Sequence, residues 1–155
     1  ILISLDTDNS HTISLSYGTD KKLFSNKYDV IIASRYKKNS KIAGLNFIRK
    51  FLSFGAAVLY KIFFPIKNVN DYTSGFRAFK LMPIKNGWKK NKNFFSEKGF
   101  SASADILLKL YKFKLNFYEL PINLRYDLKK GQSKMKVINT IYLNLALIIK
   151  RKLFS

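Results

Sequence analysis

The chain has 155 residues, the length of a single domain. Hydrophobic residues make up 47% of it and aromatic residues 15%, which is enough to build a sizeable core and argues against global disorder. The absence of cysteine excludes disulfides and thiolate metal sites, and it fits a reducing compartment. The single histidine, His11, excludes a multi-histidine metal site, and the composition leaves no Cys–His nucleophile pair.

The net charge is +20, from 29 lysines and arginines against 9 acidic residues. Such a balance predicts a polyanionic partner, which would be nucleic acid, an anionic membrane surface or phosphorylated substrates. An AT-rich genome would also produce this abundance of Lys, Asn, Ile, Phe and Tyr without selection for binding. Because no DNA- or RNA-binding motif accompanies the charge, a nucleic-acid binder is kept only as the less favoured alternative.

The first strand is predicted over 1–5, an apolar run that is followed at once by Asp6 and Asp8. Since the run starts at Ile1 without a methionine, we expect a piece of a longer protein or an incomplete gene product. Carboxylates at i and i+2 leave a strand on the same side and can turn toward one cation. Mg²⁺ takes one or two carboxylates and fills its other positions with water and phosphate oxygens. The pattern therefore predicts a metal–diphosphate site, with an ordinary Asp-rich turn as the alternative.

A second strand is predicted over 28–33, after a helix over 13–24. The strand is apolar on both faces, as in a parallel sheet buried between helices, and it runs into Arg35. Ligands of open α/β sheets bind outside the carboxyl ends of the strands, so Arg35 could meet the same phosphate as Asp6 and Asp8. A solvated loop arginine is the alternative.

The longest helix is predicted over 46–64, where apolar residues repeat every three or four positions until Pro65. We expect it to pack into the core, which is the commoner role of such a pattern. Arg49 and Lys50 near its start place cations beside an apolar body. That composition is also typical of a helix lying at a membrane interface, so this reading stays open.

The segment Asp71–Phe79 combines an acid, two hydroxyls, a glycine and an arginine. Gly75 permits a tight turn or the close approach of a ligand, and Arg77 can grip a phosphate through two hydrogen bonds. Asp71 could orient a sugar hydroxyl or pair with Arg77. A turn stabilised by Asp and Ser is the alternative to a binding site.

Four further segments are predicted in the second half of the chain: a basic, loop-rich region over 83–100, a helix over 102–113, a strand over 116–123 that carries Glu119, and a cationic loop over 125–134. Asp105 near the start of the helix favours the helix dipole. The apolar tail over 135–149 is shorter than the roughly 20 residues that span a bilayer. It predicts an amphipathic or interfacial helix, or the first part of a membrane anchor.

Four segments, in this order and spacing, resemble the inverting family-2 glycosyltransferases of the dolichol-phosphate mannosyltransferase type. They are Leu5–His11, Asp29–Tyr36, Asp71–Ala78 and Gly131–Met135. Leu124–Asp127 looks like a bacterial subgroup of the same family. The resemblance extends from Ile1 to about Ile149.

The resemblance implies an α/β protein with a GT-A fold, a Rossmann-like mixed sheet flanked by helices. Residues 1–134 would be the C-terminal part of that domain, and 135–155 an amphipathic or interfacial tail helix. It also implies a nucleotide-sugar donor, GDP-mannose or UDP-glucose, and a polyprenyl-phosphate acceptor, dolichyl or undecaprenyl. The enzyme would work at the cytoplasmic face of a membrane, peripheral to it or anchored there.

The resemblance further implies that Asp6 and Asp8 hold Mg²⁺ or Mn²⁺ against the donor diphosphate, and that Asp71 and Arg77 belong to the active site. The substrate-binding positions that it implies are Ser10, Arg35, Arg49, Arg125, Ser133 and Lys134. A phosphate acceptor is already anionic near neutral pH and needs no strong general base. Catalysis would then rest on electrostatic stabilisation and positioning, which the absence of a catalytic His or Cys allows.

The sequence departs from the family pattern in several places. The family's first half, which holds the nucleotide, is absent, so we predict that this chain alone does not transfer sugar. Asp105 stands where Glu is usual, and Phe54 and Ala57 replace residues that are often polar. A non-catalytic, truncated remnant is therefore the alternative to an enzyme.

Overall fold

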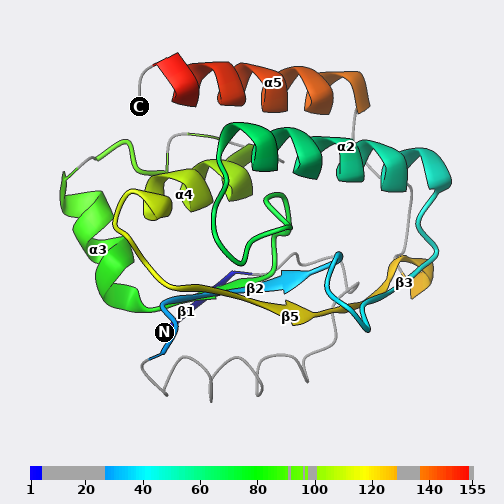
Figure 1. The fold of residues 1–155 in the computed structure, drawn as a ribbon, viewed down its shortest axis with the longest axis horizontal. Coiled ribbons are helices and arrows are strands. Elements are labelled where there is room, and N and C mark those ends of the chain that lie inside the picture. The colour runs from blue at the N-terminus through cyan, green and yellow to red at the C-terminus, as the bar shows by residue number, and fades with distance from the viewer. Residues whose placement is uncertain (5–26, 91, 96, 98–100, 129–136, 154–155) are drawn as a thin grey trace.

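The structure is a computed structural model that describes residues 1–4, 27–90, 92–95, 97, 101–128 and 137–153. Four strands form one sheet in the order β1-β4-β2-β5 (Figure 1). Their bounds are Leu2–Ser4 for β1, Val30–Ser34 for β2, Arg77–Phe79 for β4 and Phe117–Pro121 for β5. A separate two-stranded sheet joins β3 (Lys41–Ala43) to β6 (Asn123–Arg125), and a 3-10 turn follows at Tyr126–Leu128.

The main sheet is mixed. β2 runs parallel to β5, as its apolar sequence predicts, but antiparallel to β4 on its other side. β1 pairs antiparallel with β4, with Ser4 opposite Arg77. The prediction of an α/β protein with a mixed sheet flanked by helices is thus confirmed, and a purely parallel sheet around β2 is wrong.

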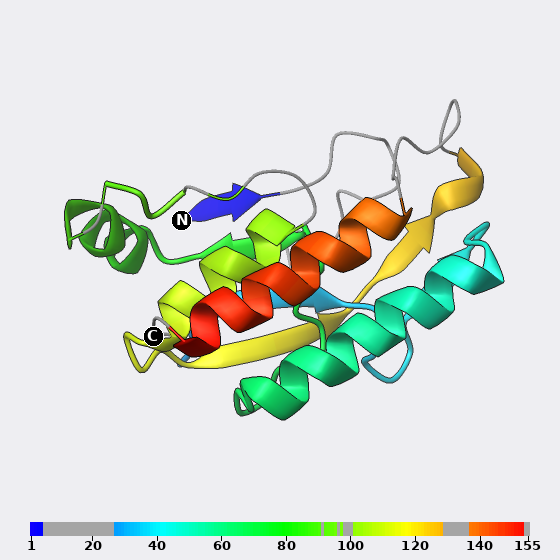
Figure 2. The same cartoon turned by 90° about the horizontal axis from the view of Figure 1, so that it is seen from above.

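Four helices accompany the described strands: α2 (Phe47–Phe63), α3 (Leu81–Lys90), α4 (Ala102–Tyr111) and α5 (Val137–Leu153). α2, α4 and α5 lie on the same side of the sheet (Figure 1). Seen from above, α2 and α5 run side by side in the same direction, with α4 next to α5 (Figure 2). The prediction of a helix in the tail is confirmed by α5.

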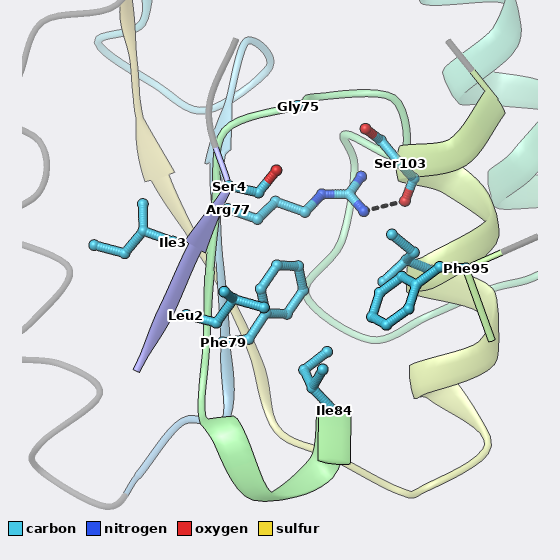
Figure 3. Close-up of a pocket in the computed structure, with 10 residues that line it drawn as sticks. Leu2, Ile3, Ser4, Gly75, Arg77, Phe79, Ile84, Phe95 and Ser103 are labelled. Atoms are coloured by element: carbon cyan, nitrogen blue, oxygen red, sulfur yellow. Dashed lines mark hydrogen bonds between the residues drawn. The ribbon is translucent and has the colours of Figure 1, made fainter. Parts of the chain in front are cut away.

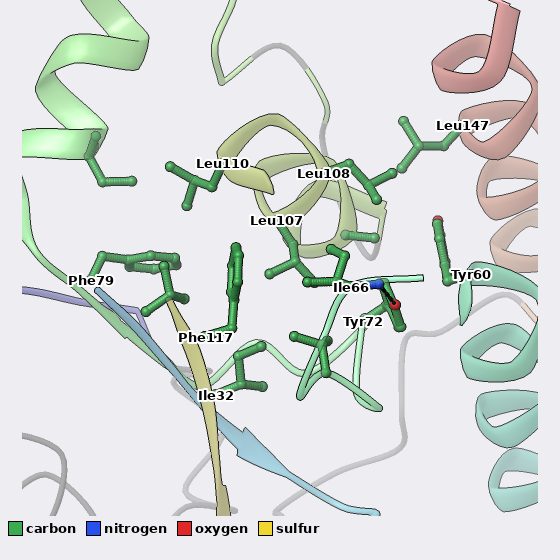
Figure 4. Close-up of a cluster of buried hydrophobic side chains, with 14 of the residues drawn as sticks. Ile32, Tyr60, Ile66, Tyr72, Phe79, Leu107, Leu108, Leu110, Phe117 and Leu147 are labelled. Carbon is green, nitrogen blue, oxygen red and sulfur yellow. Dashed lines mark hydrogen bonds between the residues drawn. The ribbon is translucent and has the colours of Figure 1, made fainter. Parts of the chain in front are cut away.

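The main core lies between the sheet and these helices (Figure 4). β2 and β5 supply Ile32 and Phe117, and α4 supplies Leu107 and Leu110, all of them buried. The loop after α2 adds Tyr72, whose hydroxyl donates to the Phe64 carbonyl at 2.6 Å and accepts from the Ile66 amide at 3.2 Å. These two hydrogen bonds hold together the loop that leads from α2 to the candidate site.

The loop-rich interpretation of 83–100 is wrong over 83–90, which belong to helix α3 (Leu81–Lys90). Pro83 does not break this helix because it occupies the third position, within the first turn, where the backbone N–H has no partner inside the helix. Gly87 lets the helix approach the Phe94 ring, since a Cβ there would lie 2.5 Å from a ring atom.

Helix α2 begins where predicted, with the Asn46 side chain accepting a hydrogen bond from the Ile48 amide at 2.9 Å. Its expected role in the core is wrong for most of its apolar residues. Only Ala57 and Tyr60 are buried, and the large apolar stripe of the helix faces outward. Among the helices that the structure describes, none is both long and apolar enough to cross a membrane.

Candidate functional site

Arg35 and Asp71 form a buried ion pair just beyond the carboxyl end of β2. The Arg35 guanidinium donates from Nε to Oδ2 of Asp71 at 2.8 Å and from Nη2 to Oδ1 at 2.6 Å. The Arg35 backbone amide adds a third bond, to Oδ2 at 2.9 Å. The carboxylate is fully buried and the Arg35 side chain is 13% exposed. This two-pronged geometry is the strong form of an arginine–carboxylate contact.

Asp71 also organises the turn that follows it. Its Oδ1 accepts from the amides of Thr73 at 3.3 Å and Ser74 at 2.9 Å, an Asx-type turn. The Thr73 hydroxyl accepts from Nη2 of Arg35 at 2.6 Å, and the Ser74 hydroxyl donates to the Ala33 carbonyl at 2.7 Å. The turn is therefore bonded to the end of β2 through both of its hydroxyls.

Glu119 on β5 also binds the start of this turn. It was not among the residues that the sequence proposed for the site. Its Oε1 accepts from the amides of Asn70 at 2.6 Å and Asp71 at 2.7 Å, and its Oε2 from the Asn70 side chain at 3.0 Å. Glu119 is 1% exposed. The signal was a carboxylate on an apolar strand, which indicates a buried acceptor for nearby backbone donors. We call Arg35, Asp71, Thr73 and Glu119 the Arg35–Asp71 cluster.

The charges of Arg35 and Asp71 stabilise each other. Burial by itself would raise the pKa of the Asp71 carboxyl, but the Arg35 guanidinium outweighs it and holds that pKa below its ordinary value. Burial likewise acts to lower the pKa of Arg35, yet the Asp71 carboxylate raises it above the ordinary arginine value. Both groups are ionised at neutral pH.

Arg77 is buried beside the Arg35–Asp71 cluster but does not pair with Asp71, the alternative that the sequence had allowed. Its Nη2 donates to the Tyr72 carbonyl at 2.6 Å and its Nη1 to the Ser103 carbonyl at the start of α4 (Figure 3). Burial lowers the pKa of this guanidinium to about 10. Nε is buried and has no hydrogen-bond partner among the described residues. Arg77 thus joins strand β4, the turn and helix α4.

A cavity of about 280 Å³ opens beside Arg77 (Figure 3). Its lining is mostly apolar and comprises Leu2, Ile3, Ser4, Gly75, Arg77, Phe79, Ile84, Phe95, Ser103 and Ile106. Ser4, the last described residue of β1, stands opposite Arg77 in the strand pairing. The cavity therefore lies at the end of the strand that leads into the Asp6–Asp8 sequence.

The structure does not bring the other described candidates into the Arg35–Asp71 cluster. Arg49 lies half-buried in the first turn of α2. Arg125 ends β6 and pairs on the surface with Asp127, at 2.6 Å between Nη2 and Oδ2. The predicted metal ligands Asp6 and Asp8, together with Ser10, Ser133 and Lys134, lie outside the described residues, as does the helix predicted over 13–24.

Asp105 has a structural role beyond the helix dipole. Its carboxylate pairs with Lys109 one turn later at 2.7 Å and with Arg151 of α5 at 2.5 Å. The carboxylate is 1% exposed. This triad ties α5 to α4, so the tail helix is fastened to the body of the protein.

No family model matches the chain. At the carboxyl edge of the mixed sheet, the charge of Arg35 is paired with that of Asp71. Within the described part of the chain, Nη1 of Arg35 makes no hydrogen bond, since Asp71 and Thr73 engage only Nε and Nη2. The N–H groups of Nη1 are donors that suit an anionic oxygen.

Proposed function

We propose that this chain is part of an inverting glycosyltransferase that moves a sugar from a nucleotide-sugar donor to a polyprenyl phosphate. The donor would be GDP-mannose or UDP-glucose, and the acceptor a dolichyl or undecaprenyl phosphate at the cytoplasmic face of a membrane. The chain would then belong to the dolichol-phosphate mannosyltransferase type, and its mixed sheet would be the sheet of a GT-A fold.

One observation carries the proposal. Arg35 and Asp71 come from two of the four segments that resemble the family, they stand 36 residues apart, and their side chains form one buried, two-pronged pair. The pair lies beyond the carboxyl end of β2, the edge at which open α/β sheets bind ligands. Two of the matched segments thus meet at one place in the fold, as a shared site requires.

In this proposal Arg35 holds the acceptor phosphate through Nη1, its remaining donor. Asp71 acts as a positioning residue, because both oxygens of its carboxylate already accept hydrogen bonds from Arg35 and from the turn. Arg77 positions the turn against α4 through the Tyr72 and Ser103 carbonyls. Arg49, Arg125, Ser10, Ser133 and Lys134 remain candidates for substrate binding.

Asp6 and Asp8 would hold the divalent cation, Mg²⁺ or Mn²⁺, since two carboxylates beside a diphosphate form the oxygen-rich set that such ions take. When bound, the ion stabilises the negative charge that develops on the leaving diphosphate. The acceptor phosphate oxygen forms the new bond to the anomeric carbon from the face opposite the diphosphate. Because that oxygen is already anionic, no side chain has to remove a proton.

The experiment measures sugar transfer in membranes from cells that express the complete open reading frame containing this chain. Radiolabelled GDP-mannose and UDP-glucose are supplied with polyprenyl phosphate, and the label in the lipid fraction is counted. We expect one donor to be used, Asp8→Ala to abolish transfer, and EDTA to have the same effect. Asp20→Ala, a carboxylate outside the matched segments, is the matched control and should retain activity.

A second variant tests the described part of the site. Arg35→Lys keeps a cation but removes the planar guanidinium group, so we expect sugar transfer to fall about 100-fold. Transfer that is undiminished in both Asp8→Ala and Arg35→Lys would overturn the assignment. Complete absence of transfer from every nucleotide sugar would favour the non-catalytic remnant.

A further inference from the structure

The cavity beside Arg77 is walled by residues of β1, β4, α3 and α4 and of the loops between them (Figure 3). No residue of the Arg35–Asp71 cluster lines it, and among the described residues no carboxylate does. Its volume is about 280 Å³, whereas an engineered cavity of about 150 Å³ holds one benzene molecule. The cavity therefore has room for a ligand of about ten non-hydrogen atoms.

The lining of this cavity separates polar from apolar groups. In Figure 3 one end is polar and is formed by Ser4, Arg77 and Ser103. The other end is apolar and is formed by Leu2, Phe79 and Ile84. A ligand that fills such a space has a polar head and an apolar body.

Arg77 brings an unsatisfied donor to the polar end. The residue is 2% exposed, and its Nη1 and Nη2 donate to the Ser103 and Tyr72 carbonyls. Nε is buried as well, yet it has no hydrogen-bond partner among the described residues. A buried donor without an acceptor costs stability, which is why such donors are rare in folded proteins. The unpartnered Nε therefore indicates that an acceptor from outside the chain belongs at this end of the cavity.

The polar end also carries a positive charge. Arg77 is protonated at neutral pH, because burial lowers its pKa only to about 10. Within the described part of the chain it forms no salt bridge, since Asp71 pairs with Arg35 instead. The hydroxyls of Ser4 and Ser103 add two groups that can donate to the same acceptor. One cation suits one negative charge, so a carboxylate fits this end better than a phosphate dianion, whose second charge would be buried without a partner.

We propose that the cavity beside Arg77 binds a medium-chain monocarboxylate, with its head at Arg77 Nε and its apolar body among Leu2, Phe79 and Ile84. The inference goes beyond the proposed function, because a nucleotide sugar is far larger than the cavity and a polyprenyl chain is far longer. Arg77 keeps its positioning role in the turn, since that role uses Nη1 and Nη2 and leaves Nε to the ligand.

A bound carboxylate would connect β1 to α4. In the described sheet β1 lies at an edge and pairs with β4 alone. A ligand that contacts Ser4 on one side and Ser103 on the other would fasten this edge strand to the helix. The midpoint of thermal unfolding should therefore rise as the concentration of the ligand increases.

The first test compares three ligands by isothermal titration calorimetry of the 155-residue chain. We expect octanoate, which has about ten non-hydrogen atoms, to bind with one-to-one stoichiometry. Octan-1-ol has the same body without the charge and should bind at least about tenfold more weakly, because hydrogen bonds to charged groups are the stronger ones. Acetate has the charge without the body. It should bind at least about 100-fold more weakly, since each buried methylene is worth about a fourfold change in affinity.

The second test uses a matched pair of variants at the mouth of the cavity. Leu2 lines the cavity and Ile1, its neighbour in the chain, does not. Their exposed fractions are 39% and 45%, so both positions can accept a larger side chain. Leu2→Trp should obstruct the cavity and weaken octanoate binding about tenfold or more, whereas Ile1→Trp should change it less than about twofold.

The third test addresses the head of the ligand. Arg77→Met removes the cation and should abolish the preference for octanoate over octan-1-ol, with circular dichroism to check that the variant folds. Ser4→Ala/Ser103→Ala leaves the positioning bonds of Arg77 in place and should by itself lower the affinity for octanoate about tenfold. In the wild-type chain, octanoate should shift the NMR resonance of the Arg77 Nε–H group, which a purely structural role of Arg77 would not do.

Equal affinities for octanoate and octan-1-ol would overturn the proposal, because the cavity would then be an apolar void that is indifferent to charge. Equal losses in Leu2→Trp and Ile1→Trp would also overturn it, since octanoate would then bind elsewhere on the basic surface. A lack of octanoate binding at millimolar concentration would leave the cavity to water and would overturn it as well. Failure of the proposed transfer reaction would leave these results as they are, since no step of the tests involves a sugar.

Discussion

The Arg35–Asp71 cluster and the outer stripe of helix α2 invert the usual distribution of residues. The cluster buries an arginine and two carboxylates and satisfies them with backbone amides and hydroxyls. The outer stripe of α2 leaves large apolar side chains in contact with solvent, namely Phe47, Phe51, Phe54, Val58 and Ile62. A buried charge is tolerated only when it is paired, and an exposed apolar stripe only when something covers it.

The difference separates a region on which the fold depends from one on which it depends little. Buried polar groups cost stability unless every partner is in place, so the cluster is a rigid and demanding arrangement. The exposed stripe contributes little to folding in water, which leaves its composition free to serve a partner. Substitutions in the two regions should therefore differ in kind as well as in size.

The largest effect is expected where the cluster loses its cation. Arg35→Met leaves the Asp71 carboxylate buried without its counter-charge, and we expect a loss of about 3–5 kcal/mol in the free energy of unfolding. Urea denaturation followed by circular dichroism measures it. Arg49→Met, at a half-buried arginine outside the cluster, should change the free energy by only about 0.5 kcal/mol. An equal change in the free energy of unfolding in both variants would show that the Arg35–Asp71 ion pair adds no stability of its own.

An intermediate effect is expected from pH. The folded pKa of Asp71 lies below its ordinary value, which is about 3.9 in an unfolded chain. The ionised carboxylate therefore contributes stability above that pH, and the contribution is lost as pH falls through the folded pKa. Asp71→Asn should be less stable than the wild type at pH 7, and the gap should narrow progressively below about pH 4. A gap that stays constant down to low pH would contradict the assignment.

The smallest effect is expected on the outer stripe of α2. Phe51→Ala should change the free energy of unfolding by no more than about 0.5 kcal/mol, because the ring is already in solvent. Phe117→Ala is the matched comparison, since it removes a buried ring from the main core and should cost about 3–5 kcal/mol. A large loss at Phe51 would mean that the stripe is part of the folded core.

The regular elements with strong periodicity could be predicted from the sequence. The strand at Val30–Ser34 and the helices at Phe47–Phe63, Ala102–Tyr111 and Val137–Leu153 all follow patterns of apolar residues. Helix α3 was not predicted, because 83–100 was interpreted as a basic, loop-rich region; a proline in the first turn is nevertheless compatible with a helix. The short strands β3 and β6 were not predicted, because three residues are too few to show an alternating apolar pattern.

The candidate site could be predicted only in part. The sequence singled out Arg35 and Asp71, but it offered Arg77 as the partner of Asp71, since the two are close in the chain. The pairing depends instead on where the turn meets the end of β2, a tertiary contact that no local pattern encodes. The outward direction of the α2 stripe was equally hidden, because a periodic apolar face looks the same whether protein or lipid covers it.

Helices α2 and α5 are joined by a buried hydrogen bond, which the Tyr60 hydroxyl donates to Asn144 Oδ1 at 2.8 Å. Sliding α5 along α2 by one turn would move Asn144 by about 5.4 Å and leave two buried polar groups unpaired, at about 1–3 kcal/mol each. Asn144 also donates to the Thr140 carbonyl of its own helix at 2.7 Å, which fixes the orientation of its amide. The hydrogen bond therefore determines which turn of α5 lies beside which turn of α2.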